Sequence, residues 1–469
     1  MKHSTTHCNS NKRIFKTRQI NFIILIFAFF FFSFHSIAQN SVSTLCGTSS
    51  QGNPLAGPNG LCISPDGTTL YVADYTANKI KRVNISTHGV TNLAGSGTGG
   101  YTDGPMSSSQ FSYPSGIKVT SDGLTLYVAD NANCLIRKID LVSGMVSTIA
   151  GVYYAFSYSD NANGMLAMFN QPVDLVIAPG DSVLYISDTE NHLIRKMNLL
   201  TTEVSTVAGT PGSFGSTDGA ALSAKFRNPK GLALSSNGNL LFIADAGNHK
   251  IRVLDILNAN VSTLAGSGTP GDTDNVSGSL ATFNTPQGVV MLPGDSILYV
   301  MDTYNNNIRA ISIATTSVNT IAGSISTAQS HFADDANGLN AKFYHPVNGA
   351  LSLASDKLYI SDQENFRVRI MNTDVVVTSI NLNPDHSNVI AYPNPVQDQL
   401  VIGSAGFGFS KVAVSIYNPV GEITFTSTFT PDREHHITVD VSHLVAGIYF
   451  LSLKTKDQVS VLRIIKSTK

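Results

Sequence analysis

The sequence predicts an all-β chain in which a six-bladed β-propeller is followed by a small Ig-like β-sandwich. The phrase Leu-Tyr-Val-Ala-Asp, or a close variant, occurs six times at a spacing of about 57 residues. A second phrase of the type Val-Ser-Thr-x-x-Gly also occurs six times. After residue 383 this pattern ends and another series of short apolar strands begins. A long, regular repeat built from strands and turns is typical of propeller folds.

One repeat shows how four strands are encoded in each unit. We expect a strand at 116–120, a tight turn at Ser121-Asp122-Gly123 and an apolar strand at 124–129. A polar turn then leads to an alternating strand at 135–141, and residues 145–150 form the fourth strand. Glycine supplies positive φ in the turn, and alternation indicates a half-exposed strand. Four antiparallel strands per repeat make one blade.

The two phrases also predict how the ring closes. The Val-Ser-Thr phrase that begins at Val42 precedes the first blade and has no inner strands of its own. The last basic strand, at 366–371, has no such phrase after it. We therefore expect the N-terminal strand to become the outer strand of the last blade, which removes two unpaired edges. The segment Val375 to Ile380 could compete for the same position.

The N-terminal region is typical of a cleaved export signal. Basic residues at 12–18 precede an apolar stretch from Ile20 to Phe34, and Ser36-Ile37-Ala38 offers the small residues that a signal peptidase reads. The alternative is a membrane anchor, but this stretch of about 15 residues is shorter than the roughly 20 that a spanning helix needs. We expect a signal peptide at 1–38, a propeller at 40–375, a linker at 376–388 and a C-terminal domain at 389–469.

Charge and cysteine content exclude several classes of protein. The whole chain has a formal charge of −2, and residues 1–38 contain five basic and no acidic residues. The exported part therefore has 25 basic and 32 acidic residues, a balance of −7, which gives no basis for nucleic-acid binding. Cys46 and Cys62 could pair or remain buried thiols, and Cys134 is left over. No spacing of Cys or His indicates a metal, and we expect no cofactor.

The repeat resembles the NHL family of six-bladed propellers. Asn191-His192-Leu193 spells the family motif, and Ile194-Arg195 follows it. A lead-in of the type Asp-Gly…Ala-x-Phe-x-x-Pro-x-Gly is present at 218–231. The resemblance covers roughly residues 40–375 and implies a propeller, and the first blade is degenerate.

The recurring polar residues are interpreted as parts of each blade. Asp130 and Asn133 recur in the later copies, where Asp at a strand end accepts bonds from turn backbone and Asn tolerates the left-handed conformation. We expect Arg137 and its equivalents to pair with neighbouring blades or solvent. Function should then lie where the copies differ, which is in the connections of about 20 residues between blades.

These connections contain the candidate binding residues. The loop after the second blade holds four aromatic residues, and rings beside hydroxyl and carboxylate groups suit sugar or peptide contacts. The alternative is that the rings pack the loops onto the blades. We predict that the chain binds a glycan, peptide or protein through Tyr153, Tyr154, Phe156, Tyr158, Tyr101 and Tyr304.

An enzyme is the alternative function, namely a propeller-fold lyase or hydrolase acting on an extracellular substrate. Propeller lactonases of the calcium-dependent type need acidic and amide ligands at the inner-strand ends. The inner strands here contain no Glu or Asp, and Asp174, just before the third, is the acidic residue nearest to that position. We assign no catalytic residue and regard enzymatic activity as undecided but less favoured.

The C-terminal segment closely resembles the type A sorting domain of the Bacteroidetes type IX secretion system, the Por type. The resemblance rests on Tyr392, Pro393, Asn394, Pro395, Gly421, Gly447, Tyr449 and Lys466 with their neighbours. It implies recognition by the type IX machinery after signal-peptide export, and a final location outside the cell or on its outer surface. Alternating strands at 411–417 and 436–441 suit a β-sandwich. A generic Ig-like adhesive module is the alternative.

Overall fold

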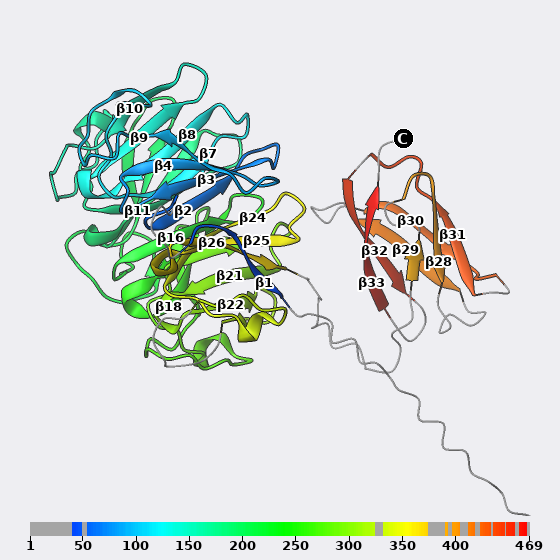
Figure 1. Cartoon of the computed structure of the whole chain (residues 1–469). Helices are drawn as coiled ribbons and strands as arrows, with labels where there is room; N and C mark the ends of the chain where they lie inside the picture. Colours follow the sequence, from blue (N-terminus) through cyan, green and yellow to red (C-terminus); the bar gives the residue numbers. More distant parts are fainter. Residues whose placement is uncertain are drawn as a thin grey trace, which may run out of the picture. The chain divides into compact units, whose positions relative to one another are not determined.

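The computed structural model contains two β-folds, which are described separately (Figure 1). It describes residues 40–48, 54–323, 332–373, 390–392, 396–403, 411–417, 423–432, 435–445, 447–454 and 459–466. The predicted signal peptide at 1–38 and the predicted linker at 376–388 lie outside these residues. Within them, no helix is both long enough and apolar enough to cross a membrane.

The first fold is a six-bladed β-propeller, as predicted. Each blade is an antiparallel sheet of four main strands. Blade 1 contains β2 (Pro58–Ile63), β3 (Thr69–Asp74), β4 (Lys79–Asn84) and β5 (Val90–Ala94). Blade 2 contains β7 (Pro114–Val119), β8 (Thr125–Asp130), β9 (Leu135–Asp140) and β10 (Met145–Ala150). Blade 3 contains β11 (Pro172–Ile177), β12 (Val183–Asp188), β13 (Leu193–Asn198) and β14 (Val204–Ala208).

Blades 4 to 6 repeat this order. Blade 4 contains β16 (Pro229–Leu234), β17 (Leu240–Asp245), β18 (Lys250–Asp255) and β19 (Asn260–Ala265). Blade 5 contains β20 (Gly288–Met291), β21 (Ile297–Asp302), β22 (Asn307–Ser312) and β23 (Val318–Ala322). Blade 6 contains β24 (Pro346–Leu351), β25 (Lys357–Asp362), β26 (Arg367–Asn372) and β1 (Val42–Cys46). Two short strands, β6 (Gly104–Pro105) and β15 (Gly219–Ala220), add a fifth strand to blades 2 and 4.

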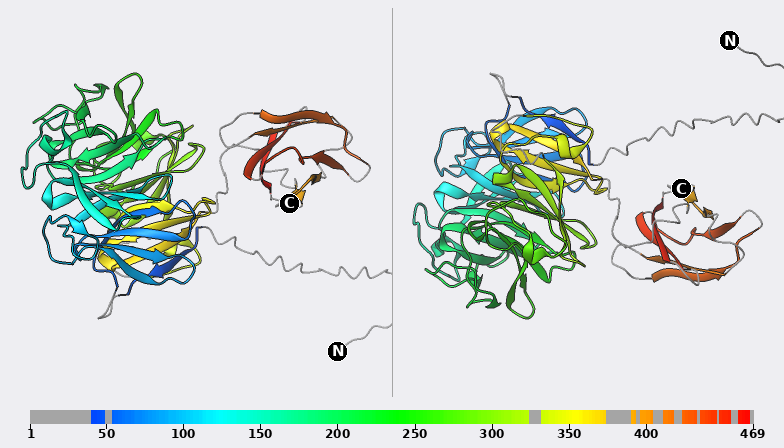
Figure 2. Two further views of the ribbon diagram at one scale, coloured as in Figure 1. Left: turned by 90° about the horizontal axis from the view of Figure 1, so that it is seen from above. Right: turned by 90° about the horizontal axis from the view of Figure 1, so that it is seen from below.

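The N-terminal strand closes the ring, as predicted from the repeat count. β1 pairs antiparallel with β26, with Val42 opposite Met371. Figure 2 shows the dark-blue start of the chain beside the yellow strands of blade 6. Thr44 donates from its backbone N–H to Asp334 at 3.1 Å, the bond that Thr148 of β10 makes to Asp103 at 2.9 Å. β1 therefore supplies the same contacts as the fourth strand of an ordinary blade. The competing segment after residue 374 lies outside the described residues.

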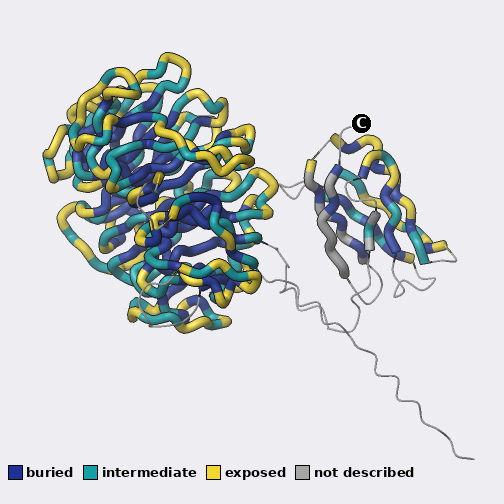
Figure 3. The backbone as a smooth tube through the Cα atoms, viewed as in Figure 1, coloured by how far each residue is buried: buried dark blue, intermediate teal, exposed yellow. Residues whose placement is uncertain are grey.

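The apolar core lies between neighbouring blades. Most residues of the second strands and at least two residues of each third strand are buried (Figure 3). In blade 2, Leu126, Val128, Ile136 and Ile139 are fully buried. Burying one such side chain stabilises the fold by about 1.5–3 kcal/mol. The motif phenylalanine of each lead-in is also buried, as Phe111 shows. Each fourth strand is followed by a glycine with positive φ, such as Gly151 at +103°, where a Cβ would lie 2.4 Å from Cys134 O.

The C-terminal fold is a two-sheet sandwich. One sheet contains β27 (Ile390–Tyr392), β28 (Gln399–Gly403) and β31 (His436–Asp440), and the other contains β30 (Ile423–Phe429), β29 (Val412–Tyr417), β32 (Gly447–Lys454) and β33 (Val459–Lys466). Inward residues of both sheets, among them Leu400, Val414 and Leu451, form one buried core. β29 and β31 match the strands expected at 411–417 and 436–441.

Candidate functional site

The connections between blades gather at one end of the propeller, which we call the loop face. Five of the six inner strands begin there with proline, as β7 does at Pro114, and all six second strands end there with aspartate, as β8 does at Asp130. Fourth strands also end there, because strands within a blade alternate in direction. The turns after the second strand and the long connections therefore share this face, so it is the part of the propeller that varies most between repeats.

The repeated Asp and Asn residues hold the loop face together rather than offering a site. Asp130 is fully buried, and its Oδ1 accepts a bond from Ser112 N at 2.8 Å. Its Oδ2 accepts from Asn133 Nδ2 at 2.8 Å and from Arg137 Nη1 at 2.7 Å. Burial raises the pKa of Asp130 to about 6, and the nearby Arg137 guanidinium opposes that rise. Asn133 also donates to Gly100 O at 2.7 Å, which anchors the preceding connection.

The prediction that the repeated arginines pair with neighbouring blades or with solvent is wrong. Arg137 is fully buried and pairs within its own blade, with Asp130 at 2.7 Å and with Asp103 of the lead-in at 2.7 Å. Its guanidinium carbon lies 5.0 Å from the centroid of the Phe111 ring. Four other blades repeat this arrangement with Arg195, Arg252, Arg309 and Arg369. A recurring Asp about 35 residues before each Arg was the sequence signal that could have revealed it.

Blade 1 departs from this arrangement. Lys81 occupies the arginine position, and its Nζ lies 4.0 Å from Asp74. Asp74 still accepts a bond from Gly57 N at 2.8 Å. Lysine cannot form the bidentate fork of arginine, so this blade lacks the double carboxylate contact. The degeneracy predicted for blade 1 therefore has a structural counterpart.

Four predicted binding residues form a continuous aromatic cluster on the loop face. The rings of Tyr101 and Tyr153 stack with centroids 3.8 Å apart and planes inclined by 23°. Tyr153 approaches Tyr154 at 5.7 Å, and Tyr154 meets Phe156 edge to face at 4.4 Å. Tyr101 comes from the connection before blade 2, whereas the other three rings come from the connection before blade 3. The structure thus joins two loops that are separate in sequence.

These rings are exposed. Tyr154 is 62% exposed, and Tyr101, Tyr153 and Phe156 range from 40% to 49%. The packing alternative predicted buried rings, which describes the motif residues Phe111 and its equivalents but not this cluster. Tyr154 and Phe156 have positive φ, of 59° and 35°. Non-glycine residues seldom adopt this conformation, so the loop is held in an uncommon shape.

The other two predicted binding residues stand apart from the cluster. Tyr158 is on the same connection and is 44% exposed, but within the described part of the chain it joins none of these ring contacts. Tyr304 belongs to the turn η6 (Thr303–Asn305) of blade 5 and contacts His345 at 5.0 Å. Tyr304 therefore marks a second aromatic position on the loop face.

The central axis of the propeller carries a small polar group. Asp174 was predicted to precede the third inner strand, but it lies within β11, so this inner strand does contain an acidic residue. Asp174 is 2% exposed, and its Oδ2 accepts a bond from Leu232 N at 3.1 Å. Its Oδ1 is buried without a hydrogen-bond partner among the described residues. Burial raises the pKa of Asp174, while Lys118 is the strongest opposing influence and Asn348 also lowers it. Glycine fills this strand position in four blades, where a side chain would meet the next strand, as Gly60 would meet Ser115 O.

The described residues contain neither a disulfide nor a cluster of metal-ligating side chains. Cys46, Cys62 and Cys134 are free and buried. Burial raises the pKa of both Cys46 and Cys62 to about 12, so neither is a reactive thiolate at neutral pH. Across the described ranges, no group of three or more His, Cys, Asp or Glu side chains is arranged to hold a metal ion.

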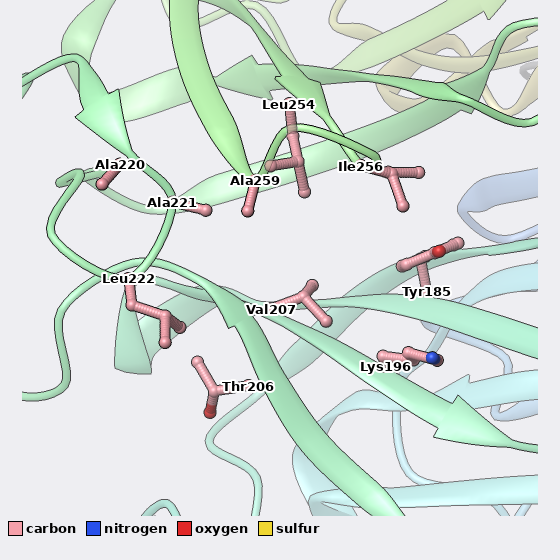
Figure 4. A pocket seen from close by; sticks show the side chains of 10 residues that line it. All are labelled: Tyr185, Lys196, Thr206, Val207, Ala220, Ala221, Leu222, Leu254, Ile256 and Ala259. Carbon is pink, nitrogen blue, oxygen red and sulfur yellow. The ribbon is translucent and has the colours of Figure 1, made fainter.

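An apolar pocket of about 400 Å³ lies between blades 3 and 4 (Figure 4). Leu254, Ile256 and Ala259 line one side of it, and Tyr185 and Val207 line the other. Ile256 and Ala259 belong to the turn between β18 and β19, at the end opposite the loop face. The pocket therefore offers apolar contact away from the aromatic cluster.

Some of the predicted sorting residues meet in the C-terminal sandwich. Gly447 and Lys466 are opposite each other in the β32–β33 pair, and Tyr449 lies two residues along β32. Tyr449 is 5% exposed, and its hydroxyl donates to Val445 O at 3.1 Å. Tyr392 ends β27. Pro393, Asn394, Pro395 and Gly421 lie outside the described residues.

The fold and its buried network define a six-bladed β-propeller joined to a β-sandwich. Residues 94–312 match the teneurin NHL domain family, and residues 390–467 match the family of secretion system C-terminal sorting domains. The chain is an NHL-repeat propeller with a C-terminal sorting domain of the type IX secretion system. That domain directs the chain to the cell surface or the extracellular space and implies contact with the type IX machinery.

Known proteins similar to the chain include several with NHL repeats. Human NHL repeat-containing protein 2 is 29% identical over 47% of this chain and 42% of its own length. Protein SUPPRESSOR OF QUENCHING 1, chloroplastic, from Arabidopsis thaliana is 27% identical over 68% of this chain and 30% of its own length. The chain therefore spans less than half the length of these relatives.

A solved structure shares the fold. An auxiliary nutrient binding protein from Bacteroides thetaiotaomicron superposes with a TM-score of 0.54 at 17% identity, covering 71% of this chain and 76% of that one. At this identity the likeness concerns the fold alone.

Proposed function

We propose that this chain is an exported binding protein that holds a glycan, peptide or protein partner non-covalently through the loop face. The signal peptide at 1–38 is part of the same proposal, because type IX secretion begins with passage into the periplasm. Binding is centred on the aromatic cluster of Tyr101, Tyr153, Tyr154 and Phe156.

The exposure of this cluster is the observation that carries the proposal. The five motif phenylalanines of the lead-ins are buried under arginine, whereas these non-repeated rings are exposed. A contiguous group of large apolar rings exposed to solvent is typical of interaction sites. Tyrosine also adds a hydroxyl that can bond to a polar partner.

The fold of the Bacteroides thetaiotaomicron neighbour is compatible with this role, since that protein is described as a nutrient binding protein. The enzyme alternative would require chemistry near the central axis. There, Asp174 Oδ2 accepts a bond from a backbone N–H of the next blade, Lys118 lies nearby, and Oδ1 has no hydrogen-bond partner among the described residues. The binding proposal therefore rests on the exposed aromatic cluster, and an enzyme that uses Asp174 is the alternative.

An array of glycans and peptides tests the proposal. The full chain is compared with a Tyr153→Ala/Tyr154→Ala variant, and Phe214→Ala serves as the matched control on the same face, because Arg227 already covers that ring. We expect at least one ligand class to bind the full chain and the control, and to be lost with the double variant. Equal binding by all three proteins would refute the site. Turnover of a lactone or polysaccharide that disappears with Asp174→Asn would favour the enzyme.

A further inference from the structure

We propose that the aromatic cluster receives lysine or arginine side chains from a polypeptide partner. This inference rests on the proposed function and specifies its ligand as a basic segment of protein. It follows from how this chain fills equivalent ring positions elsewhere on the same face.

Two exposed rings of the loop face are already covered by arginine. Arg227 lies over Phe214, with its guanidinium carbon 5.5 Å from the ring centroid. Arg367 lies over Phe332 at 3.8 Å. Phe214 and Phe332 are 62% and 39% exposed and belong to the connections before blades 4 and 6. Where a connection provides an exposed ring and a cation is within reach, the cation occupies the ring face.

The cluster has rings but no cation of its own. Residues 95–113 and 151–171, which form its two connections, contain no Lys, Arg or His. In the described structure, no arginine or lysine lies over Tyr101, Tyr153, Tyr154 or Phe156. Stacking with Tyr101 covers one face of Tyr153, and Tyr154 remains the most exposed ring of the group. The cluster thus has aromatic surface available to a cation from outside.

The surrounding charge also favours a cation. Arg137 is bound by two carboxylates, Asp130 and Asp103, and Arg195 likewise by Asp188 and Asp160. Each set of one arginine and two ionised carboxylates therefore has a net charge of −1. Asp103 and Asp160 are about half exposed and lie two residues from Tyr101 and Tyr158. A basic partner is attracted to this surface, whereas an anionic one is repelled.

The expected affinity is modest for a single side chain. An exposed cation–π contact strengthens binding by about two- to five-fold per ring. A segment with several basic residues can engage more than one ring together with the acidic surroundings. Binding should therefore weaken as salt concentration rises, because exposed charges are screened.

Three short probes separate the ligand classes. The full chain is immobilised and titrated by surface plasmon resonance with blocked decapeptides of alternating Gly-Arg or Gly-Gln, and with cellohexaose. We expect the Gly-Arg peptide to bind more than ten-fold tighter than the Gly-Gln peptide. Tyr154→Leu should lower its affinity about two- to five-fold, since leucine keeps apolar bulk but has no ring face. Tyr154→Phe should keep it, because the ring face remains.

Phe214→Leu is the control, because the exposed Phe214 ring lies on the same face but Arg227 already covers it. This variant should leave Gly-Arg affinity unchanged, and unaltered melting temperatures confirm that the variants fold. Equal binding of the Gly-Arg and Gly-Gln peptides, or equal affinity for Tyr154→Leu and Tyr154→Phe, overturns the inference. Binding of cellohexaose that Tyr154→Leu abolishes, without Gly-Arg binding, also overturns it but leaves the proposed function intact.

Discussion

The Nδ1 atom of His249 accepts a hydrogen bond of 3.0 Å from the backbone N–H of Thr285, and this bond joins blade 4 to blade 5. His192 does the same for blades 3 and 4, where Asn228 N is the donor at 3.2 Å. In blades 1 and 5 the acceptor is the Oδ1 of Asn78 or Asn306. The histidine of the NHL motif therefore acts here as a junction between blades, and the position requires an acceptor rather than an imidazole.

This junction predicts a pH dependence of stability. Burial lowers the pKa of His192 and His249 below the ordinary value of 6.5, and Arg227 lowers both further, while Glu190 and the Thr189 carbonyl oppose part of the shift of the His192 pKa. Neutral imidazole accepts the backbone bond, so its contribution is present above pH 6.5 and is lost as the pH falls through the folded pKa. A His192→Asn/His249→Asn variant keeps an acceptor that does not titrate. We expect the wild-type chain to lose stability relative to this variant between pH 8 and pH 5, measured as urea midpoints. Parallel pH profiles would contradict the assignment.

Removing a buried arginine should be costly. Arg195 pairs with the fully buried Asp188 at 2.7 Å and with Asp160 at 2.6 Å. Arg195→Met leaves Asp188 buried without its counter-charge, for an expected loss of about 3–5 kcal/mol in the free energy of unfolding. Lys81→Met in blade 1 is the control, with a smaller expected loss, because Lys81 Nζ is 4.0 Å from Asp74 and forms no second ion pair among the described residues. Denaturant titration measures both, and similar losses would mean that the fork geometry of arginine is unimportant.

Replacing Asn307 by leucine should stabilise the propeller. Asn307 is fully buried, and neither its Nδ2 nor its Oδ1 has a hydrogen-bond partner among the described residues. Leu135 and Leu193 occupy the same position in blades 2 and 3 and are buried there. Asn307→Leu removes two unsatisfied groups, so we expect a gain of about 1–3 kcal/mol. The control is Asn305→Leu, which loses the bonds of Asn305 Nδ2 to Asp302 and Gly271 and should destabilise. A loss with Asn307→Leu would show that an ordered water satisfies the amide.

Deleting residues 40–47 should open the ring. The deletion removes β1 and leaves the backbone groups of β26 unpaired at a sheet edge. Exposed edges promote association between chains. We expect a lower melting temperature and oligomers in size-exclusion chromatography, with recovery of the monomer when a peptide of residues 40–47 is added. Ser43→Lys, at an exposed position of β1, should behave as wild type. A deleted chain that stays monomeric and equally stable would show that another segment completes blade 6.

The blade number and the closure could be predicted because both depend on counting phrases that recur. The buried arginines could not be placed from local pattern alone. Arg137 occupies a polar position of an alternating strand, and its burial depends on Asp103 and Phe111, which lie far away in sequence.

The sequence also could not predict which aromatic side chains of the connections are exposed. Phe169 and Tyr154 belong to the same loop, yet the first is fully buried and the second is 62% exposed. The difference arises because Arg195 covers Phe169, whereas no described cation covers Tyr154. Pattern could identify the loop as unusual, but only three-dimensional contacts separate its structural ring from its exposed ones.

The closing strand sets the order in which this protein can assemble. Asn372 Nδ2 donates to Ser41 Oγ at 2.7 Å across 331 positions of sequence. Blade 6 cannot be completed until nearly all of the propeller sequence has been synthesised or has crossed a membrane. Contacts that span so much of a chain form slowly. The first strand of the propeller to be synthesised is therefore the last to be placed, and the ring stays open until β26 is available to pair with it.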